Sequence, residues 1–284
     1  MMNEPRRAAS GRGPRLTRRG RVVLIVAAVA VVAAVAVLVP LLRTGGSPEG
    51  GPKKTVSLLV PEGRRATQVY ASVDKVLGVP PGTTAKTATG TPLGLPGAAR
   101  HNPEGYLFPA TYPVGEGATP AGLLGYMVDT ARQRFGSDRI TEGARRNGVS
   151  VYQTVTIASI VQAEADTPAD MGRVARVVHN RLARDMALQM DSTLNYALNR
   201  STLDTTHSDT KTASPYNTYE SKGLPPTPIG NPGEEAMNAA INPTRGDWLY
   251  FVTVAPGDTR FTADYAEHRS NVEEFNANRS TPTD

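Results

Sequence analysis

Glu164 is the residue of this sequence best placed to do chemistry, because it is a lone carboxylate near the end of a mostly apolar stretch that begins at Ser150. Ile160, Val161 and Ala165 are among its close neighbours. A carboxyl group in such surroundings loses hydration, which raises its pKa and keeps it protonated closer to neutral pH. These residues therefore predict a general acid.

A structural role for Glu164 is the alternative. It would then be a solvated carboxylate at a helix end, or the partner of an arginine in the next segment such as Arg173, since buried ion pairs also shift pKa values. On an ideal helix Gln162 and Asp166 lie about 200° from Glu164, so we expect neither to share a cleft with it. An acid on this helix is thus expected to act alone.

A buried helix is expected to position Glu164. Ser150 can cap its first turn, and Gln153 can return the hydrogen bond. Apolar residues recur at core-facing spacing, namely Val151, Val155, Ala158, Val161 and Ala165. Thr167 and Pro168 then begin another helix, with Met171, Val174, Val178 and Leu182 inward and with Arg173, Arg176, Asn180, Arg181 and Arg184 expected mostly on a solvated face.

The N-terminal part of the chain predicts a membrane anchor. Residues 1–21 hold seven arginines and few apolar groups, so we expect them to be disordered. Residues 22–42 carry no charge, and these 21 residues are enough to cross about 30 Å of hydrocarbon as a helix. A cleaved signal peptide is the competing interpretation, but its apolar region is usually shorter. The arginine excess predicts a cytoplasmic N-terminus and an extracytoplasmic remainder, joined through a linker at 43–54.

The remainder predicts an α+β fold. Residues 55–100 are expected to form a small α+β unit, with a strand at 55–60, a helix at 66–77 and an irregular connection from 80 onward. Residues 101–279 are expected to form the main domain. Its expected elements are helices from 119 to 135, 231 to 241 and 264 to 276, and a strand at 248–254 with a return strand at 260–262. The aromatic stretch 104–114 fits either an extended segment in a cleft or a strand packed on the core.

Residues 189–229 are the least regular part of that domain. They are dense in Asn, Thr, Ser and Tyr, which can hydrogen-bond sugar hydroxyls and stack on pyranose faces. An ordinary surface loop has the same composition, although a loop of this length is more often functional. His268 is expected to be structural.

Charge and composition exclude several classes of protein. Residues 44–284 hold 23 Lys and Arg against 25 Asp and Glu, so nucleic-acid binding is not expected. The chain has no cysteine, which excludes disulfides, thiolate metal sites and a cysteine nucleophile. No metal-ligand cluster, phosphate-binding loop or serine-nucleophile motif is present, and no cofactor is expected.

Seven short motifs together resemble one family. They are Glu104-Gly-Tyr-Leu-Phe-Pro, Ala158-Ser-Ile-Val-Gln-Ala-Glu164, Asn180-Arg-Leu, Leu188-Gln-Met-Asp-Ser-Thr193, Tyr216-Asn-Thr-Tyr219, Gly223-Leu-Pro-Pro226 and Leu249-Tyr-Phe-Val252. In this order they resemble the MltG-type (YceG-like) endolytic murein transglycosylases, from about Thr55 to Phe275. Each motif alone is weak, but seven behind one predicted anchor are specific.

The resemblance implies a bacterial single-pass membrane enzyme with a reduced LysM-like α+β unit and a mixed helix/strand YceG-like catalytic domain. Its substrate would be nascent peptidoglycan glycan, cut between N-acetylmuramic acid and N-acetylglucosamine to leave a 1,6-anhydromuramic end and so terminate elongation. Its partners would be glycan strands, the plasma membrane and peptidoglycan synthases. The family's catalytic glutamate falls on Glu164. Substrate binding would involve Glu104, Tyr106, Gln189, Asp191, Asn217 and Tyr219, while relatives often carry a second acid where this chain has Gln162.

A lone carboxyl group suits that reaction. Ordinary glycosidases need two carboxyl groups roughly 5 to 9.5 Å apart, whereas a lytic transglycosylase uses the muramyl 6-hydroxyl as an internal nucleophile. Two rival functions stay open. One is a muramidase that uses Glu164 with Asp191, and the other is a non-catalytic peptidoglycan-binding scaffold.

Overall fold

The structure, a computed structural model, describes residues 56–200 and 205–280, which belong to one compact unit spanning Thr55–Asp284. The predicted tail at 1–21, membrane segment at 22–42 and linker at 43–54 lie outside the described residues. Within the described part of the chain, no helix is both long enough and apolar enough to cross a membrane.

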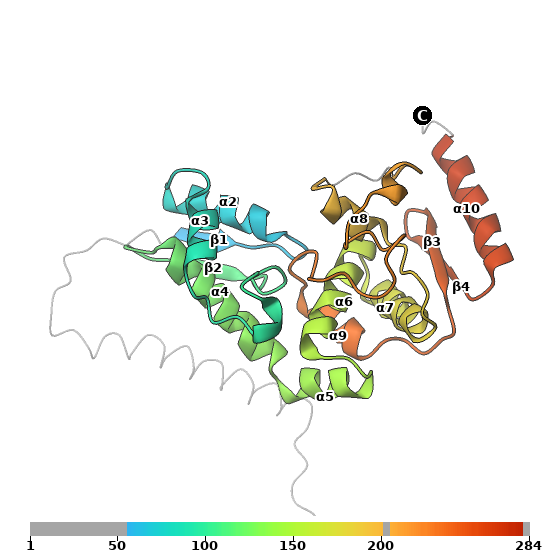
Figure 1. Ribbon diagram of the computed structural model, residues 1–284, viewed down its shortest axis with the longest axis horizontal. Helices are drawn as coiled ribbons and strands as arrows, with labels where there is room; N and C mark the ends of the chain where they lie inside the picture. The colour runs from blue at the N-terminus through green and yellow to red at the C-terminus, as the bar shows by residue number, and fades with distance from the viewer. Residues whose placement is uncertain (1–55, 201–204, 281–284) are drawn as a thin grey trace, which may run out of the picture. The chain divides into compact units, whose positions relative to one another are not determined.

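The described chain is a mixed α+β fold made mostly of helices (Figure 1). Its elements are, in order, β1 Val56–Leu59, α2 Ala66–Leu77, α3 Thr83–Gly90, β2 Thr111–Val114, α4 Pro120–Phe135, α5 Asp138–Arg146, α6 Val151–Glu164, α7 Pro168–Ala183, α8 Asp191–Ala197, α9 Glu234–Ile241, β3 Tyr250–Ala255, β4 Asp258–Thr262 and α10 Tyr265–Ser280. Short 3-10 turns lie at Gly97–Ala99 and Asp209–Lys211. The α+β class is as predicted.

Helix α6 lies at the centre of the packing. It begins with the predicted capping box, in which Ser150 Oγ accepts from Gln153 N and the Gln153 side chain accepts from Ser150 N. Every residue from Thr154 to Val161 is buried, because α5, α7, α8 and α9 all pack against this helix. The helix ends at Glu164, where packing gives way to an open surface.

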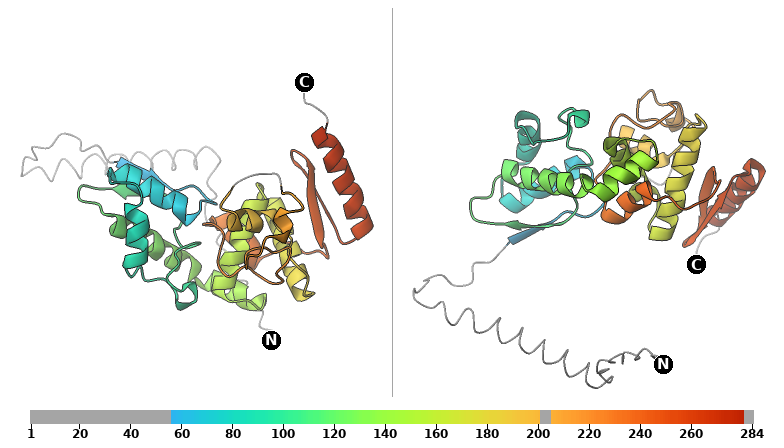
Figure 2. Two further views of the ribbon diagram at one scale, coloured as in Figure 1. Left: turned by 45° about the horizontal axis from the view of Figure 1, so that its top comes forward. Right: turned by 90° about the horizontal axis from the view of Figure 1, so that it is seen from below.

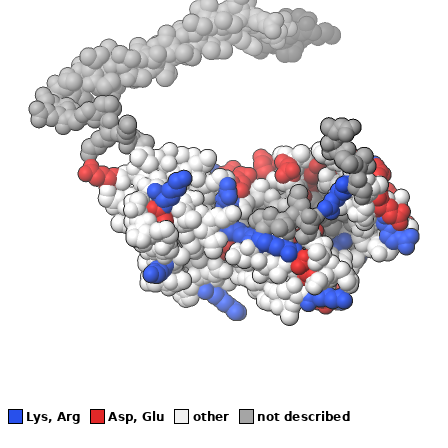
Figure 3. Space-filling view, turned by 90° about the horizontal axis from the view of Figure 1, so that it is seen from above, with Lys and Arg blue, Asp and Glu red and all other residues white. Residues whose placement is uncertain are grey.

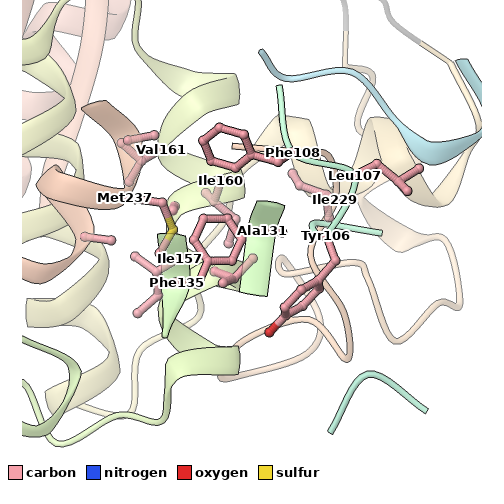
Figure 4. Close-up of a cluster of buried hydrophobic side chains, with 14 of the residues drawn as sticks. Tyr106, Leu107, Phe108, Ala131, Phe135, Ile157, Ile160, Val161, Ile229 and Met237 are labelled. Atoms are coloured by element: carbon pink, nitrogen blue, oxygen red, sulfur yellow. The ribbon is translucent and has the colours of Figure 1, made fainter. Parts of the chain in front are cut away.

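The aromatic stretch at 104–114 is part of the core. Tyr106, Leu107 and Phe108 are buried, and Figure 4 shows them beside Phe135 and the α6 side chains. The Phe135 ring meets Tyr106 and Phe108 edge to face, with centroids 5.8 and 5.9 Å apart. Of the two interpretations of this stretch, packing on the core is therefore the one observed.

The N-terminal segment is joined to the main domain by strand pairing. Strand β1 pairs antiparallel with β2, with Val56 opposite Val114. Asn231 adds a second connection, because its backbone N–H and its side-chain amide both donate to Arg64 O while its Oδ1 accepts from Leu107 N. The pairing of β1 with β2 thus links residues on the two sides of the boundary expected after residue 100.

The C-terminal part is a hairpin with one covering helix. Strands β3 and β4 pair antiparallel with Tyr250 opposite Thr262, and α10 packs on both strands (Figure 2). This confirms the predicted strand, turn, strand and helix. The helix continues beyond the predicted residue 276, to Ser280.

Three helices were not expected, and the reason differs between them. Helix α3 replaces part of the predicted irregular connection, because the buried Asp74 carboxylate accepts from Gly82 N and from Thr84 N and Oγ1 at its start. Helix α5 buries only Ile140, Gly143 and Ala144 and rests on α9. Helix α8 has seven residues, too few for an apolar period to be recognised.

A buried carboxyl group links the N-terminal helix to the later part of the chain. Glu104 Oε1 accepts from Ala66 N at 2.9 Å, at the start of α2, and Oε2 accepts from the Tyr196 hydroxyl at 3.1 Å. Burial raises the pKa of Glu104 to about 7, although these hydrogen bonds and the charge of Arg65 act to lower it.

This pKa makes stability depend on pH. Between its ordinary value of 4.5 and about 7, the folded protein holds a proton that the unfolded chain has released, so the contribution of Glu104 to stability falls as pH rises. Glu104→Gln cannot ionise, and its amide oxygen can accept from Ala66 N while its amide nitrogen donates to the Tyr196 hydroxyl. We expect the stability of this variant relative to the unchanged protein to rise by roughly 2 to 3 kcal/mol between about pH 5 and pH 8, measured by urea unfolding. A difference that does not vary with pH would contradict this, and Glu142→Gln on exposed α5 is the control.

The contact between α5 and α9 allows a second test. A Cβ atom at Gly143 would lie 2.5 Å from Ile241 Cβ, whereas one at Gly125 in α4 would meet nothing within 4 Å. Gly143→Ala should therefore lower the free energy of unfolding by about 1 to 3 kcal/mol through overpacking. Gly125→Ala should raise it by about 0.5 to 1 kcal/mol, since alanine favours a helix. Equal melting temperatures for the two variants would refute the close packing of α5 on α9.

Candidate functional site

A large cleft lies at the C-terminal end of α6. Its volume is about 1330 Å³, which exceeds the usual 300 to 1,000 Å³ of a small-molecule site. One part of its lining comes from the turn between β1 and α2 (residues 61–65), Gln68 and the end of α6 (162–164). The middle of the chain contributes residues 188–192 together with Arg181, Asn195, Tyr219 and Ile229. Strand β3 (250–253) and helix α10 complete the lining. Elements from both ends of the described chain thus form one cleft.

Glu164 lies in this cleft as the last residue of α6 and is half-buried. Burial raises the pKa of its carboxyl group, and the charge of Asp191 raises it further. The hydroxyl and the backbone N–H of Ser192 act in the opposite direction, and that N–H donates to Glu164 Oε1 at 3.2 Å. A carboxyl group with a raised pKa in an open cleft can donate a proton near neutral pH.

The ion pair considered for Glu164 is not observed. Arg173 instead pairs with Asp170 at 3.5 Å and lies over the Phe261 ring. Within the described ranges 56–200 and 205–280, no arginine, lysine or histidine forms a salt bridge with Glu164. The raised pKa of Glu164 therefore reflects desolvation that no cation of the described residues offsets through an ion pair.

Asp191 and Tyr219 lie in the same cleft and are bonded to each other. The Tyr219 hydroxyl donates to Asp191 Oδ1 at 2.5 Å. Burial raises the Tyr219 pKa, and the negative charges of Asp191 and Glu164 raise it further, so this hydroxyl stays protonated. Asp191 is the first residue of α8, next to the Ser192 N–H that binds Glu164. The chain thus brings together two carboxyl groups and a phenol hydroxyl.

Gln189 also lines the cleft, as predicted. Its backbone N–H donates to Thr218 O, and its Oε1 accepts from Arg181 Nη1 at 3.3 Å. Its φ of 51° places it in the left-handed region, which a non-glycine residue adopts only when its surroundings hold it there. Gln189 is therefore fixed by the loop that carries Tyr219.

Three predicted substrate-binding residues do not line the cleft. Tyr106 is 3% exposed and lies against Phe135 and Tyr152, and Glu104 is equally buried in the link between Ala66 and Tyr196. Asn217 is fully buried. Its side chain donates to Thr210 O and Thr212 O and accepts from Tyr219 N, so it shapes the loop that presents Tyr219. All three side chains are buried against other parts of the protein. The motifs alone do not distinguish such residues from residues that bind a ligand.

Gln162 was expected not to share a cleft with Glu164, but it lines the same cleft. The cleft extends round the exposed end of α6, so residues two positions apart both reach it. Gln162 Oε1 accepts from Gly233 N at 2.9 Å and thereby holds the start of α9. Its amide therefore has a structural bond within the cleft wall.

Arg181 was expected on a solvated face, but it lines the cleft. It is buried, its Nε donates to Leu249 O at 2.6 Å, and its Nη1 donates to Leu188 O at 2.7 Å. It thus joins α7, the Leu188–Asp191 loop and the start of β3. A sequence signal exists, because Arg181 is spaced three and seven residues from buried Val178 and Val174 and so falls on the apolar face of α7.

The cleft lining carries ionisable groups of both signs. It contains four carboxyl groups, Glu62, Glu164, Asp191 and Glu273, and four guanidinium groups, Arg64, Arg65, Arg181 and Arg269. On the face in Figure 3, basic and acidic side chains are likewise both present rather than one sign covering it. Among the residues that the structure places, no cluster of three or more His, Asp or Glu could hold a metal ion. The arrangement suits acid–base chemistry on a ligand of low charge.

Proteins of similar sequence include endolytic murein transglycosylases from two bacteria. An endolytic murein transglycosylase of Bacillus subtilis is 36% identical over 177 residues, which is 62% of this chain and 49% of the relative. One of Streptococcus pneumoniae strain D39 is 36% identical over 182 residues, which is 62% of this chain and 33% of the relative. The matched region therefore spans about half or a third of those proteins.

A solved structure and a family description agree with these matches. The crystal structure of a yceG-like protein from Listeria monocytogenes superimposes with a TM-score of 0.67 at 30% identity, covering 76% of this chain and 75% of that one. The sequence model of the YceG-like family matches residues 34–274 of this chain. Since that match extends over most of the sequence, the chain belongs to the YceG-like family.

Proposed function

We propose that this protein is an endolytic murein transglycosylase. It cuts peptidoglycan glycan between N-acetylmuramic acid and N-acetylglucosamine and leaves a 1,6-anhydromuramic end. The observation that carries the proposal is the position of Glu164, a half-buried carboxyl group of raised pKa without an ion-pair partner in the described part, inside a cleft of about 1330 Å³. The matched relatives, which carry this name, support the same activity.

The reaction needs one group that gives and then takes a proton. Protonated Glu164 first donates its proton to the bridging oxygen, so that the bond from this oxygen to the muramyl C1 breaks. The muramyl 6-hydroxyl then forms a bond to C1, and ionised Glu164 removes the hydroxyl proton. No water is consumed, and Glu164 ends the cycle in its original protonated state. Desolvation favours that state at the start of each cycle.

Asp191, Tyr219 and Gln189 are proposed to orient the sugar beside Glu164. All three line the cleft, and the bond from the Tyr219 hydroxyl to Asp191 fixes both groups. Asp191 is thereby bound as a hydrogen-bond acceptor, which suits a carboxylate that stabilises positive charge developing at the sugar ring.

A muramidase is the second candidate, and the presence of Asp191 favours it. Because Asp191 acts electrostatically on Glu164 within the same cleft, the two could serve as the pair of carboxyl groups that a hydrolase uses. The products differ, since a hydrolase adds water and leaves a reducing end, whereas the transglycosylase leaves an anhydro ring.

Replacement of Glu164 tests the catalytic role. Glu164→Gln keeps the size of the side chain but cannot transfer a proton, so we expect the rate of glycan cleavage to fall by roughly 10² to 10⁴. The melting temperature should hold or rise at neutral pH, because a desolvated carboxyl group has been removed. A near-normal rate of release of 1,6-anhydro products would overturn the assignment, and a normal rate with Glu142→Gln is the matched control. A lower melting temperature together with a normal rate would assign Glu164 a structural role, whereas the absence of glycan cleavage by the unchanged protein would indicate the scaffold.

Replacement of Asp191 separates the two reactions. Asp191→Asn keeps an acceptor for the Tyr219 hydroxyl but removes a negative charge. We expect anhydro products to persist at a reduced rate, as seen by mass spectrometry of the digested glycan. Exclusive reducing ends from the unchanged protein, abolished by Asp191→Asn, would instead establish the muramidase.

The setting of this activity is proposed from residues outside the described part. Residues 22–42 would anchor the protein in the bacterial cell membrane as a single pass, with the N-terminus cytoplasmic and the catalytic domain outside, where it meets nascent strands and peptidoglycan synthases and terminates elongation. The basic residues before this segment support that orientation.

A reporter fusion tests this topology. An enzyme that is active only outside the cytoplasm, fused after Asp284, should be active because the arginines of residues 1–21 hold that end inside. Activity only from a cytoplasmic reporter at the same position would contradict the anchor.

A further inference from the structure

The α10 helix turns one complete face toward the cleft. Its lining residues include Tyr265, His268, Arg269, Val272, Glu273 and Asn276, which recur at the spacing of three and four residues that defines one helix face. From Tyr265 to Asn276 this face extends about 16 Å along the helix axis. The cleft thus continues well beyond Glu164, and nothing in the acid–base chemistry of Glu164 uses this wall.

Tyr265 is the most unusual residue on this face. Its side chain is 59% exposed although it belongs to the cleft lining. The other large apolar side chains that are exposed in the described part, Val56, Leu59 and Tyr126, do not line the cleft. The Tyr265 ring is supported by Tyr250 and His268, with centroids 5.6 and 6.4 Å away, and more than half of the residue's surface remains exposed to a ligand.

The support beneath Tyr265 is connected to the loop beside Glu164. The Tyr250 ring stacks on His268 at 4.9 Å, and the Arg181 guanidinium lies 5.3 Å from the same ring. Arg181 also binds the Leu188 carbonyl and the Gln189 side chain. A ligand on Tyr265 would therefore rest on a wall joined to the loop that carries Asp191.

The chemistry of this wall identifies the class of ligand. An exposed aromatic ring beside charged and amide groups matches a sugar, which has an apolar ring face and polar hydroxyl edges. Since the lining carries both carboxyl and guanidinium groups, it does not favour a polymer densely charged with one sign. The cleft is also larger than a site for one small molecule. A stretch of polysaccharide of low charge density satisfies all three conditions.

We propose that the α10 wall is a distal glycan-binding subsite in which Tyr265 stacks on a sugar ring several units away from the bond that is cut. This rests on the proposed function, because the glycan is taken to be the strand that Glu164 cleaves. Contacts far from Glu164 anchor a long strand and present an internal bond to the acid, so the subsite selects long strands over short fragments.

Binding to Tyr265→Ala tests the subsite, with Tyr126→Ala as a matched control. Tyr126 is 52% exposed and likewise leans on another tyrosine, Tyr112, but lies outside the cleft. Both substitutions are made in the full chain carrying Glu164→Gln, so that substrate survives, and the probes are long peptide-free glycan strands and their repeating disaccharide. We expect Tyr265→Ala to weaken binding of long strands about three- to ten-fold and to leave disaccharide binding unchanged. Tyr126→Ala should change neither.

A conservative variant guards against misfolding. Tyr265→Phe retains the ring and should bind long strands as the parent does, whereas a loss of binding in Tyr265→Phe as large as in Tyr265→Ala would rule out stacking. Equal binding of long strands by Tyr265→Ala and Tyr126→Ala overturns the proposal, and so does an equal loss for strands and disaccharide. These binding results are separate from the assignment of Glu164, which fails only if Glu164→Gln still cleaves glycan.

Discussion

The burial of α6 is the constraint on which the rest of the structure depends. Four helices cover it, so its whole centre is apolar or internally hydrogen-bonded, and polar side chains reach the cleft only at its C-terminal end. Glu164 occupies that end. The packing that stabilises the helix therefore also removes water from one side of the carboxyl group, and the same burial accounts for both the fold and the raised pKa.

Arg181 gives the site its second fixed component. Its guanidinium binds backbone carbonyls of two segments that are far apart in sequence, the loop at Leu188 and the start of β3 at Leu249. Because carbonyl oxygens carry no formal charge, burying this cation is costly unless several bonds satisfy it, and the bonds it makes set the loop in one position. Glu164 and Asp191 are thus placed by independent elements that converge on one cleft.

Much of this could be predicted from the sequence, because it depends on local pattern. The capping box at Ser150, the apolar spacing of α4, α6 and α7, and the turn of the hairpin are contained within short windows. The misplaced residues depend on contacts of other kinds. Tyr106 and Arg181 are buried against segments far away in the chain, Tyr106 against Phe135 and Tyr152 and Arg181 at Leu249. Asn217 and Asp74 instead bind groups within 10 residues, but through side-chain bonds to the backbone that no apolar spacing indicates. Polar and aromatic residues that bind backbone look the same in sequence as those that bind a ligand.

The two walls of the cleft come from opposite parts of the described chain, residues 61–68 before the central helices and residues 265–276 after them. A ribosome makes the chain from the N-terminus onward, and the earlier segments can pack as they emerge. Glu164 and the residues of the first wall are therefore synthesised before α10, and a nascent chain without α10 lacks one wall of the cleft. Completion of this wall, rather than of the acid–base groups, waits for the end of the described chain, so a chain truncated before α10 has its acid but lacks the surface that would hold a polymer against it.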